Sequence, residues 1–352
     1  MSSKLKVAIV GFGWFGKQHY SVYKSMPDVE VVSICDTNNN AFSYSHNVQD
    51  EFHKNISSTN NNNAITAKLY TDIVDMLKHE QIDLLDITAI ESEHYTLAML
   101  GLDAGCHLLV EKPLTINYDH SLRLYETALQ KNLYFYTGNV LRFDSRYRAL
   151  SNILSNIDVT QNLRHMSLER NFQVKSHYTY GRVHPAYSAC VHDIDLTLWL
   201  SHQNVTSVTA YGRNFLNRTY PDSLVALLEL QNGALACIQN VWHISDKCPY
   251  GFEFSTKLMT NQNYYQIRNE PVIHCWHDSG VEYPEMFFWP TIDSHISGAL
   301  KDEITHYVAC AKQSIESPVL SMKDSIRSIQ VASSMVESLT NKNKSIQIKG
   351  DI

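Results

Sequence analysis

The sequence predicts an α/β protein with two domains, the first built on a parallel sheet and the second on a large, mostly antiparallel open sheet. Over about the first 130 residues, short apolar runs alternate with helical patterns, which is typical of βαβ units. Beyond about residue 140, β-like segments follow one another and two helical stretches close the chain. We therefore assign 1–130 to the first domain and 131–352 to the second, and we allow for a C-terminal helix that packs back on the first domain.

Five strands are expected in the first part of the chain. They are KVAIVGFG at 6–13, EVVSICD at 30–36, DLLDITAI at 83–90, HLLVEK at 107–112 and LYFYTGN at 133–139. A helical pattern over 93–104 ends at Gly105, a residue typical of a helix C-cap. The Asn-rich segment 55–64 is expected to form a surface loop.

The second domain is expected to contain strands at 164–173, 206–215, 223–231 and 234–244. Asn232-Gly233, between the last two, is a strong hairpin signal. Apolar residues at helical spacing over 322–339 predict a helix near the end of the chain. The stretch ALACIQNVW has apolar residues on both faces of its strand, which fits a paired sheet and favours a homodimer or a homotetramer.

The composition argues against several classes of protein. With 44% hydrophobic and 18% charged residues the chain can bury a large core. The net charge of −7 gives no electrostatic reason to expect a nucleic acid or an anionic membrane as a partner. No stretch approaches the ~20 apolar residues that a membrane-spanning helix needs.

The seven cysteines are scattered and form no CxxC pair, which is typical of reduced thiols in the cytoplasm, where we expect the protein. HCWH at 274–277 contains residues that bind metals, but His274 and Cys275 would point to opposite faces of a strand. We therefore expect neither a disulfide framework nor a metal site.

The glycine-rich sequence GFGWFG follows the first expected strand and opens a helical segment. Its glycines, Gly11, Gly13 and Gly16, have the G-x-G-x-x-G spacing of a dinucleotide-binding loop in the context that this motif requires. The first glycine allows a tight turn, the second lets backbone approach a pyrophosphate, and the third permits close packing of helix on strand. The helix N-terminus adds partial positive charge. We therefore predict a Rossmann domain.

Asp36 ends the second expected strand, about 20 residues beyond the glycine loop. A carboxylate at this position accepts hydrogen bonds from the adenosine ribose and repels the 2′-phosphate of NADP. The next residues, Thr37 and Asn38, include no arginine for that phosphate. The sequence therefore favours NAD over NADP as cofactor. The competing interpretation is a glycine turn and a surface aspartate without a ligand.

With the glycine loop, Asp36 and EKP at 111–113 in one chain, the sequence resembles the glucose–fructose oxidoreductase, inositol dehydrogenase and rhizopine catabolism (Gfo/Idh/MocA) family. The resemblance extends to YTDIVDML at 70–77, to LRFDSRYRAL at 141–150 and to HDIDLTLWL at 192–200. It implies a Rossmann domain followed by an α/β domain with an open sheet. It also implies NAD(P)-dependent oxidation or reduction of a small-molecule substrate at a sugar, cyclitol or sugar-nucleotide carbon.

The resemblance implies that Lys112 stands beside the nicotinamide and the substrate hydroxyl, where a cation stabilises a developing alkoxide. Burial would lower the lysine pKa and let it shuttle the proton, while Glu111 would help to hold it and Pro113 would fix the turn. His192, in an H-x-x-D motif, would accept or donate the proton. Asp195, one helical turn on, either orients the histidine ring or only supports the helix.

The remaining positions implied by the resemblance line the cofactor or the substrate. For the cofactor they are Gly11, Phe12, Gly13, Trp14, Phe15, Gly16, Asp36, Thr88, Ala89, His94, Glu111, Lys112 and Arg142. For the substrate they are Lys112, Arg142, Ser188 and His192.

The chain departs from the family pattern at two places. Many members carry an aspartate where this chain has Ser188, and a serine cannot act as a carboxylate base. Where the family often has Thr-Pro, this chain has Ala89-Ile90, and a loop without proline is less preset. Arg142 has two equal interpretations, a contact with substrate or cofactor and a structural interdomain ion pair.

Three functions are therefore compared. The first is an NAD-dependent dehydrogenase or reductase acting on a sugar-like alcohol. The second is a glycoside-cleaving enzyme that oxidises its substrate transiently with tightly held NAD. The third is a non-catalytic, cofactor-binding regulator, an interpretation that Ser188 keeps open and that intact Lys112 and His192 argue against.

Overall fold

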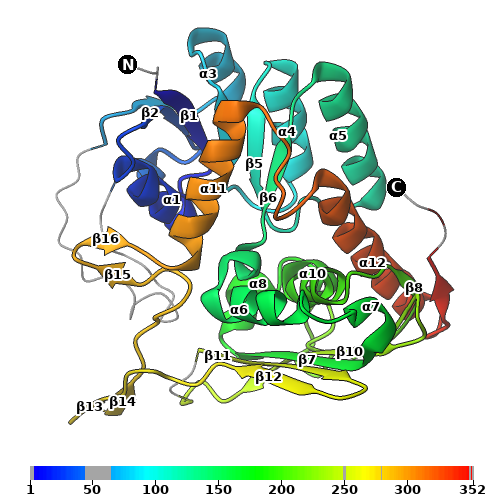
Figure 1. Cartoon of the computed structure of the whole chain (residues 1–352). Helices are drawn as coiled ribbons and strands as arrows, with labels where there is room; N and C mark the ends of the chain where they lie inside the picture. Colours follow the sequence, from blue (N-terminus) through cyan, green and yellow to red (C-terminus); the bar gives the residue numbers. More distant parts are fainter. Residues whose placement is uncertain (1–3, 44–64, 249–250, 279, 349, 351–352) are drawn as a thin grey trace. The chain divides into compact units, whose positions relative to one another are not determined.

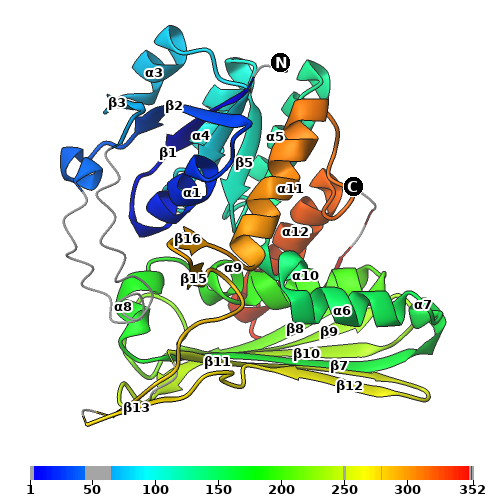
Figure 2. The same ribbon diagram turned by 60° about the vertical axis from the view of Figure 1, so that its left-hand side comes forward.

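The computed structural model describes residues 4–43, 65–248, 251–278, 280–348 and 350. The Asn-rich segment 55–64, which we expect to be a surface loop, lies outside these residues. The chain forms two compact units (Figures 1 and 2). Unit 1 comprises residues 1–143 and 286–325, and unit 2 comprises residues 144–285 and 326–352.

Unit 1 is an α/β unit in which strands and helices alternate. Its elements are β1 (Leu5–Val10), α1 (Trp14–Lys24), β2 (Val29–Cys35), η1 (Asn39–Phe42), β3 (Lys68–Tyr70), α3 (Ile73–His79), β4 (Leu84–Ile87), α4 (His94–Asp103), β5 (His107–Glu111), α5 (Tyr118–Lys131), β6 (Phe135–Gly138), η2 (Val140–Phe143), β15 (Thr291–Ile292), β16 (His295–Ile296) and α11 (Ala299–Gln313). Helix α12 (Met322–Thr340) begins in unit 1 and continues in unit 2.

The main sheet of unit 1 is parallel throughout, in the order β3-β2-β1-β4-β5-β6. This is the Rossmann order, in which the chain reverses its direction of winding between β1 and β4 and leaves a crevice at the carboxyl ends of those strands. Helices α1 and α11 cover one face of the sheet, and α3, α4 and α5 cover the other (Figures 1 and 2). Because both faces are covered, β4 and β5 are buried along their whole length.

The boundary of unit 1 differs from our prediction. We placed it after residue 130, whereas the chain leaves unit 1 after Phe143 and returns to it over 286–325. The physical reason is pairing, since β6 extends the parallel sheet beside β5. The returning segment then packs against β6, where the Tyr307 hydroxyl donates to the Thr137 carbonyl at 2.9 Å and the Tyr136 hydroxyl donates to the Ile315 carbonyl at 2.8 Å.

Unit 2 combines one large sheet with helices. Its elements are α6 (Ser145–Leu154), α7 (Val159–Asn162), β7 (Leu163–Gln173), α8 (Ser176–Tyr180), α9 (Pro185–Ser188), α10 (Cys190–Ser201), β8 (Val205–Arg213), β9 (Ser223–Leu230), β10 (Leu235–Ile244), β11 (Phe252–Thr260), β12 (Tyr264–Arg268), β13 (Cys275–His277), β14 (Gly280–Glu282) and β17 (Ile346–Gln347). The expected strands at 164–173, 206–215, 223–231 and 234–244 correspond to β7, β8, β9 and β10.

The large sheet of unit 2 has the order β12-β11-β7-β10-β9-β8-β17 and is antiparallel except where β10 pairs with β7. The predicted fold class is therefore confirmed for both sheets. The predicted hairpin at Asn232-Gly233 joins β9 to β10, with Gly233 at φ +82°. Along β9 buried and exposed residues alternate, because the helices of this unit cover one face of its sheet (Figure 2).

Within the described residues, none of the helices combines the length and the apolar character that crossing a membrane requires.

Candidate active site

The glycine loop lies at the carboxyl end of β1 and leads directly into α1. Gly11 has φ +89°, and a Cβ atom there would lie 2.5 Å from the Ala89 backbone nitrogen, so only glycine fits. A Cβ atom on Gly16 would lie 2.2 Å from the Gly11 carbonyl oxygen. Gly13 differs from both, because a Cβ atom there would meet nothing within 4 Å. The loop therefore packs tightly against the sheet at its two ends and leaves open space at its centre.

Aromatic residues surround this loop. Phe12 is fully buried, and its ring meets Tyr20 edge-on at 5.7 Å. Trp14 and Phe15 open α1, and each ring lies 5.7 Å from that of Trp289, which belongs to the returning segment of unit 1. Aromatic side chains from two distant parts of the chain thus meet beside the start of α1, while Gly13 stays exposed.

Asp36 lies directly after β2, next to the glycine loop. Its Oδ2 accepts a hydrogen bond from the Phe12 backbone N–H at 2.7 Å, and its Oδ1 accepts one from the Asn38 N–H at 2.8 Å. The sequence did not reveal that Lys17 of α1 is close to this carboxylate. Burial lowers the pKa of Lys17, and the charge of Asp36 partly opposes that shift. Asp36 is therefore held in a fixed orientation and stays half-buried at the edge of the sheet.

Thr88, Ala89 and His94 form the segment after β4. The Thr88 hydroxyl donates to the Gly11 carbonyl at 2.5 Å and so ties this segment to the glycine loop. His94 begins α4 and is buried; its Nδ1 lies 2.8 Å from the Pro113 carbonyl oxygen and its Nε2 lies 3.0 Å from that of Ala89. The His94 ring thereby joins the loop after β4 to the loop after β5.

Glu111 ends β5 and Lys112 follows it, at the same edge of the sheet as Gly11 and Asp36. The Glu111 carboxylate accepts a hydrogen bond from the Lys112 backbone N–H at 3.1 Å. The Lys112–Pro113 peptide bond is cis. Lys112 is half-buried, whereas Glu111 is only 8% exposed. The structure thus brings the predicted glycine loop, Asp36 and Lys112 to one edge of the parallel sheet.

Arg142 lies in η2, one turn beyond β6, and is 3% exposed. One of its guanidinium nitrogens donates to the Val319 carbonyl at 2.6 Å, and both residues belong to unit 1. This contact fastens the returning segment of the chain and is a structural role for the side chain.

The candidate residues of unit 2 lie on two consecutive helices. Ser188 ends α9 and is buried, and His192 lies in the first turn of α10. Ten of the twelve residues of α10 are buried, and the two that are not, His192 and Trp199, lie two turns apart on one face. Asp195 is 1% exposed. His192 is therefore the polar side chain that α10 presents outside its own packed faces.

Sequence reasoning missed the residue that anchors α10. Asp193, next to His192, is 1% exposed and pairs with Arg170 of β7. Two guanidinium nitrogens of Arg170 donate to the two carboxylate oxygens of Asp193, at 3.1 and 2.9 Å. Such a bidentate pair fixes the orientation of both groups. The pair holds the first turn of α10, and with it the backbone of His192, against the sheet.

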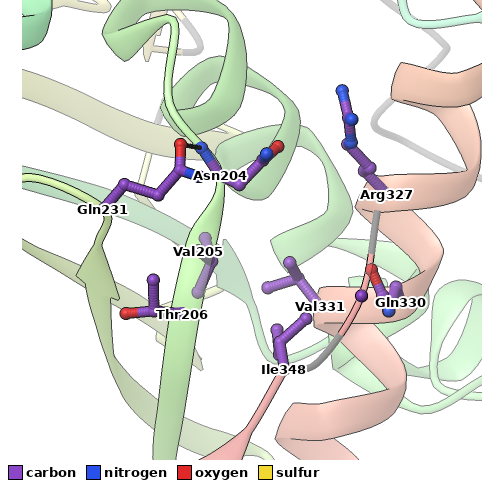
Figure 3. Close-up of a pocket in the computed structure, with 9 residues that line it drawn as sticks. Asn204, Val205, Thr206, Gln231, Arg327, Gln330, Val331 and Ile348 are labelled. Carbon is purple, nitrogen blue, oxygen red and sulfur yellow. Dashed lines mark hydrogen bonds between the residues drawn. The ribbon is translucent and has the colours of Figure 1, made fainter. Parts of the chain in front are cut away.

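A pocket of about 250 Å³ lies elsewhere in unit 2 (Figure 3). It is lined by Asn204, Val205, Thr206, Gln231, Arg327, Gln330, Val331, Ile348 and Gly350. Figure 3 shows the Gln231 side chain directed at the Asn204 backbone, whose N–H it accepts at 3.1 Å. The pocket contains none of the candidate residues. Among the described residues, no group of three or more His, Cys, Asp or Glu side chains is placed to hold a metal ion.

Comparison with known families agrees with this geometry. A family model described as "Oxidoreductase family, NAD-binding Rossmann fold" matches residues 5–139, and a model described as "GFO/IDH/MocA C-terminal domain" matches residues 175–257. The fold and the sequence thus define the class as an NAD-binding oxidoreductase. Within that class, the chain belongs to the Gfo/Idh/MocA family.

Several proteins that are similar to this chain in sequence are named inositol dehydrogenases. The inositol 2-dehydrogenase of Salmonella typhimurium is 27% identical over 254 residues, which cover 71% of this chain and 69% of the relative. That of Corynebacterium glutamicum is 25% identical over 287 residues, covering 79% and 78%.

Solved structures show the same fold. Myo-inositol 2-dehydrogenase from Lactobacillus plantarum superposes with a TM-score of 0.80 at 20% identity, over 99% of this chain and 100% of that one. Scyllo-inositol dehydrogenase from Lactobacillus casei, solved with bound NAD(H) and scyllo-inositol, superposes with a TM-score of 0.78 at 17% identity, covering 98% and 99%.

Proposed function

We propose that this protein is an NAD-dependent dehydrogenase or reductase that acts on a secondary alcohol carbon of a cyclitol or a related sugar. The observation that carries this proposal is the shared edge of the unit 1 sheet, where the glycine loop, Asp36 and Lys112 follow β1, β2 and β5. Ligands of such sheets bind outside the carboxyl ends of the strands. This edge of the sheet can therefore bind a dinucleotide next to the cation of Lys112.

The glycine loop and Asp36 fit NAD. The open space at Gly13, where even a Cβ atom would touch nothing, leaves backbone accessible to a pyrophosphate at the start of α1. The fixed carboxylate of Asp36 suits a ribose with two free hydroxyls and disfavours a 2′-phosphate. We therefore expect a higher kcat/KM with NAD than with NADP, and a comparison of the two cofactors under matched conditions tests this.

In this mechanism Lys112 of unit 1 and His192 of unit 2 handle the proton. Bound NAD supplies the chemistry of accepting a hydride from carbon. As the hydroxyl proton leaves, the substrate oxygen gains negative charge, which the Lys112 ammonium would stabilise until the carbonyl forms. The His192 imidazole takes the hydroxyl proton and returns it in the reverse direction. Ser188, in the place of the family aspartate, contributes a hydrogen bond to the substrate and no base.

Inositols are the proposed first substrates. The Salmonella typhimurium and Corynebacterium glutamicum relatives are named inositol 2-dehydrogenases, and the Lactobacillus casei structure contains scyllo-inositol. The proposal predicts NADH formation, followed by its near-ultraviolet absorbance, with a panel that begins with myo- and scyllo-inositol and continues with sugars and nucleotide sugars. Lys112→Ala should lower kcat by about 100-fold or more, because it removes the cation at the developing alkoxide.

The matched control is Lys131→Ala, which removes a surface lysine whose ion pair with Asp103 lies at the other end of the helices of unit 1. It should retain turnover. NAD binding by Lys112→Ala, measured by calorimetry, separates lost chemistry from lost folding. Unchanged turnover in Lys112→Ala would refute the catalytic role. Wild-type protein that binds NAD but forms no NADH would favour transient oxidation by held NAD or a regulatory role.

We also propose that the protein self-associates through the uncovered face of the unit 2 sheet. Tyr211, Val225, Leu227 and Leu235 are 39–56% exposed on this face. Val225 is the strand neighbour of Tyr211, and Leu227 that of Cys237, so apolar side chains lie next to one another across β8, β9 and β10. Contiguous apolar surface of this kind is typical of interfaces between proteins.

A further inference from the structure

A group of buried ionisable side chains lies beneath the catalytic edge of unit 1. His19 of α1 is fully buried, and its Nδ1 lies 2.8 Å from Asp86 Oδ2 on β4. Its Nε2 lies 3.6 Å from Glu111 Oε1 at the end of β5. Asp86 is fully buried as well. One imidazole thus stands between two carboxylates from adjacent strands.

The surroundings favour the charged form of this imidazole. Burial by itself would lower the pKa of His19, but the carboxylates of Asp86 and Glu111 outweigh it and raise the pKa to about 10. The other groups that face the cluster are the Tyr23 hydroxyl on α1 and the Glu303 carboxyl on α11, both buried. None of them supplies a positive charge. A neutral His19 would leave the two carboxylates without a buried cation between them.

The Glu111 carboxylate contacts three neighbouring groups of unit 1. On one side the carboxylate faces His19, and on another it packs against Gly138 of β6, where a Cβ atom would lie 2.2 Å from Glu111 Oε1. The remaining oxygen of the carboxylate accepts the Lys112 backbone N–H. Glu111 is therefore confined between His19, Gly138 and the peptide that carries Lys112.

We propose that His19 is a positioning residue: its imidazolium holds the Glu111 carboxylate, and Glu111 in turn fixes the backbone of Lys112 at the end of β5. The inference rests on the proposed function for its effect on turnover. The structural part of the inference is that the position of the Lys112 amide depends on His19. This part does not depend on the proposed function. His19 follows the last glycine of the loop by one helical turn, so α1 serves both the cofactor loop and, through its buried face, the catalytic lysine.

Two variants test the proposal by independent routes. His19→Gln removes the charge and keeps a side chain of similar reach. Gly138→Ala leaves His19 intact but forces the Glu111 carboxylate away from its site, since the new methyl group would occupy its place. Both should lower kcat by up to about 100-fold while NAD affinity changes little, because displacements of about 1 Å at a reacting group have effects of that size.

The matched control is His107→Gln. His107 begins β5, the strand that Glu111 ends, and it is 9% exposed, with a pKa lowered by burial. This variant should leave kcat unchanged even if it lowers the melting temperature. Equal losses of kcat in His107→Gln and His19→Gln would mean that only general packing was disturbed.

A double-variant cycle separates positioning from independent effects. If His19 acts through Glu111, then His19→Gln with Glu111→Gln should be no slower than the slower single variant, because residues that act as a unit are strongly non-additive. Losses of kcat that multiply would overturn the proposal.

A readout without turnover distinguishes failure of this inference from failure of the proposed function. In protein labelled with ¹⁵N-lysine, the amide signal of Lys112, assigned with Lys112→Arg, should shift in His19→Gln and Gly138→Ala and remain in place in His107→Gln. An unmoved signal in the first two variants would refute the positioning role, whatever the enzyme's substrate proves to be.

Discussion

At the scale of single residues, Lys112 stands in an unusual place, since it follows a strand that is buried along its whole length. Lysine is seldom buried without a partner. Here the chain places Glu111 immediately before it, with a carboxylate that binds the lysine's own backbone N–H. That carboxylate is in turn next to His19. The lysine thus belongs to an ordered group of charges and is held by more than its own side chain.

The charge of His19 predicts a pH dependence of folding. The folded-state pKa of about 10 lies above the ordinary value of 6.5, so the stability that protonated His19 contributes is fully present below about pH 6.5. It is lost as the pH rises through about 10. The free energy of unfolding, from urea titrations between pH 7 and pH 10, should therefore fall more steeply for wild type than for His19→Gln.

Other groups that titrate in this range are common to both proteins and cancel in the difference between them. The groups that face His19 are the carboxylates of Asp86 and Glu111, and the Tyr23 hydroxyl and the Glu303 carboxyl lie next in the same buried cluster. Parallel pH curves for wild type and His19→Gln would mean that the buried imidazole is neutral.

At the scale of secondary-structure elements, α10 illustrates how a helix with almost no exposed surface is oriented. Its packed faces are mainly apolar, with a few buried polar residues, among which Asp193 forms the pair with Arg170 that links the helix to β7. Arg170 also lies against the face of the Phe254 ring, 5.5 Å from its centroid. The first turn of α10 is therefore set by a buried ion pair, while apolar contacts hold the rest of the helix.

Breaking this pair from one side should be costly. Asp193→Asn or Arg170→Met would leave a buried charge without its partner, and we expect each to lower the free energy of unfolding by about 3–5 kcal/mol. The double variant Arg170→Met/Asp193→Leu should regain most of that loss, since apolar replacements of buried pairs are often neutral. Chemical denaturation of the three variants measures these differences.

A control comes from the neighbouring residue of the same strand. Glu169 forms an ion pair with Lys257 at 3.3 Å, with both side chains about one-third exposed. Glu169→Gln should lower stability by less than about 1 kcal/mol, as is usual for exposed pairs. Suppose instead that Arg170→Met/Asp193→Leu is as unstable as the two single variants. The loss of stability would then not come from an unpaired buried charge, and the Arg170–Asp193 pair itself would stabilise the fold.

At the scale of the whole molecule, the proposed association through the uncovered face of the unit 2 sheet predicts how mutations on that face change the molar mass in solution. Leu227→Asp places a carboxylate in the centre of the apolar surface and should lower the molar mass measured by light scattering or sedimentation. Leu129→Asp, on α5 of unit 1 and 50% exposed, is the control and should leave the mass unchanged. An unaltered mass in Leu227→Asp would exclude this face as the interface.

The sequence predicted those parts of the site that short motifs carry. Gly11, Gly13, Gly16 and Asp36 could be found because each has a fixed spacing from a recognisable strand. His19 could not be selected among 17 histidines, because its partner Asp86 lies 67 residues away and only the fold brings them together. The helical spacing did carry one indication that His19 is buried. His19 lies one turn after Gly16, which packs against the sheet, and so it lies on the same buried face of α1.

The fold was predictable from alternation and periodicity, but its domain boundary was not. The pattern of β6 resembles that of any short strand, and only its pairing with β5 assigns it to unit 1. Nothing local in 286–325 distinguishes a segment that returns to unit 1 from one that stays in unit 2. The Arg170–Asp193 pair could not be predicted for a related reason. No sequence motif spans β7 and α10, so nothing in the sequence indicates that these two residues meet.

The returning segment has a consequence for biosynthesis. When residue 143 leaves the ribosome, Tyr136 and Thr137 have not yet met their partners, because Ile315 and Tyr307 are translated only after almost all of unit 2. The part of the first sheet that α11 covers therefore lacks its partner until residues 144–285 of unit 2 have been made, whereas α1 is already present on the same face (Figures 1 and 2). In many proteins the N-terminal domain is complete before the next domain is synthesised. Unit 1 of this protein cannot be completed in that order, because it includes residues 286–325. Unit 1 is therefore completed only after residues 144–285 of unit 2 have been made.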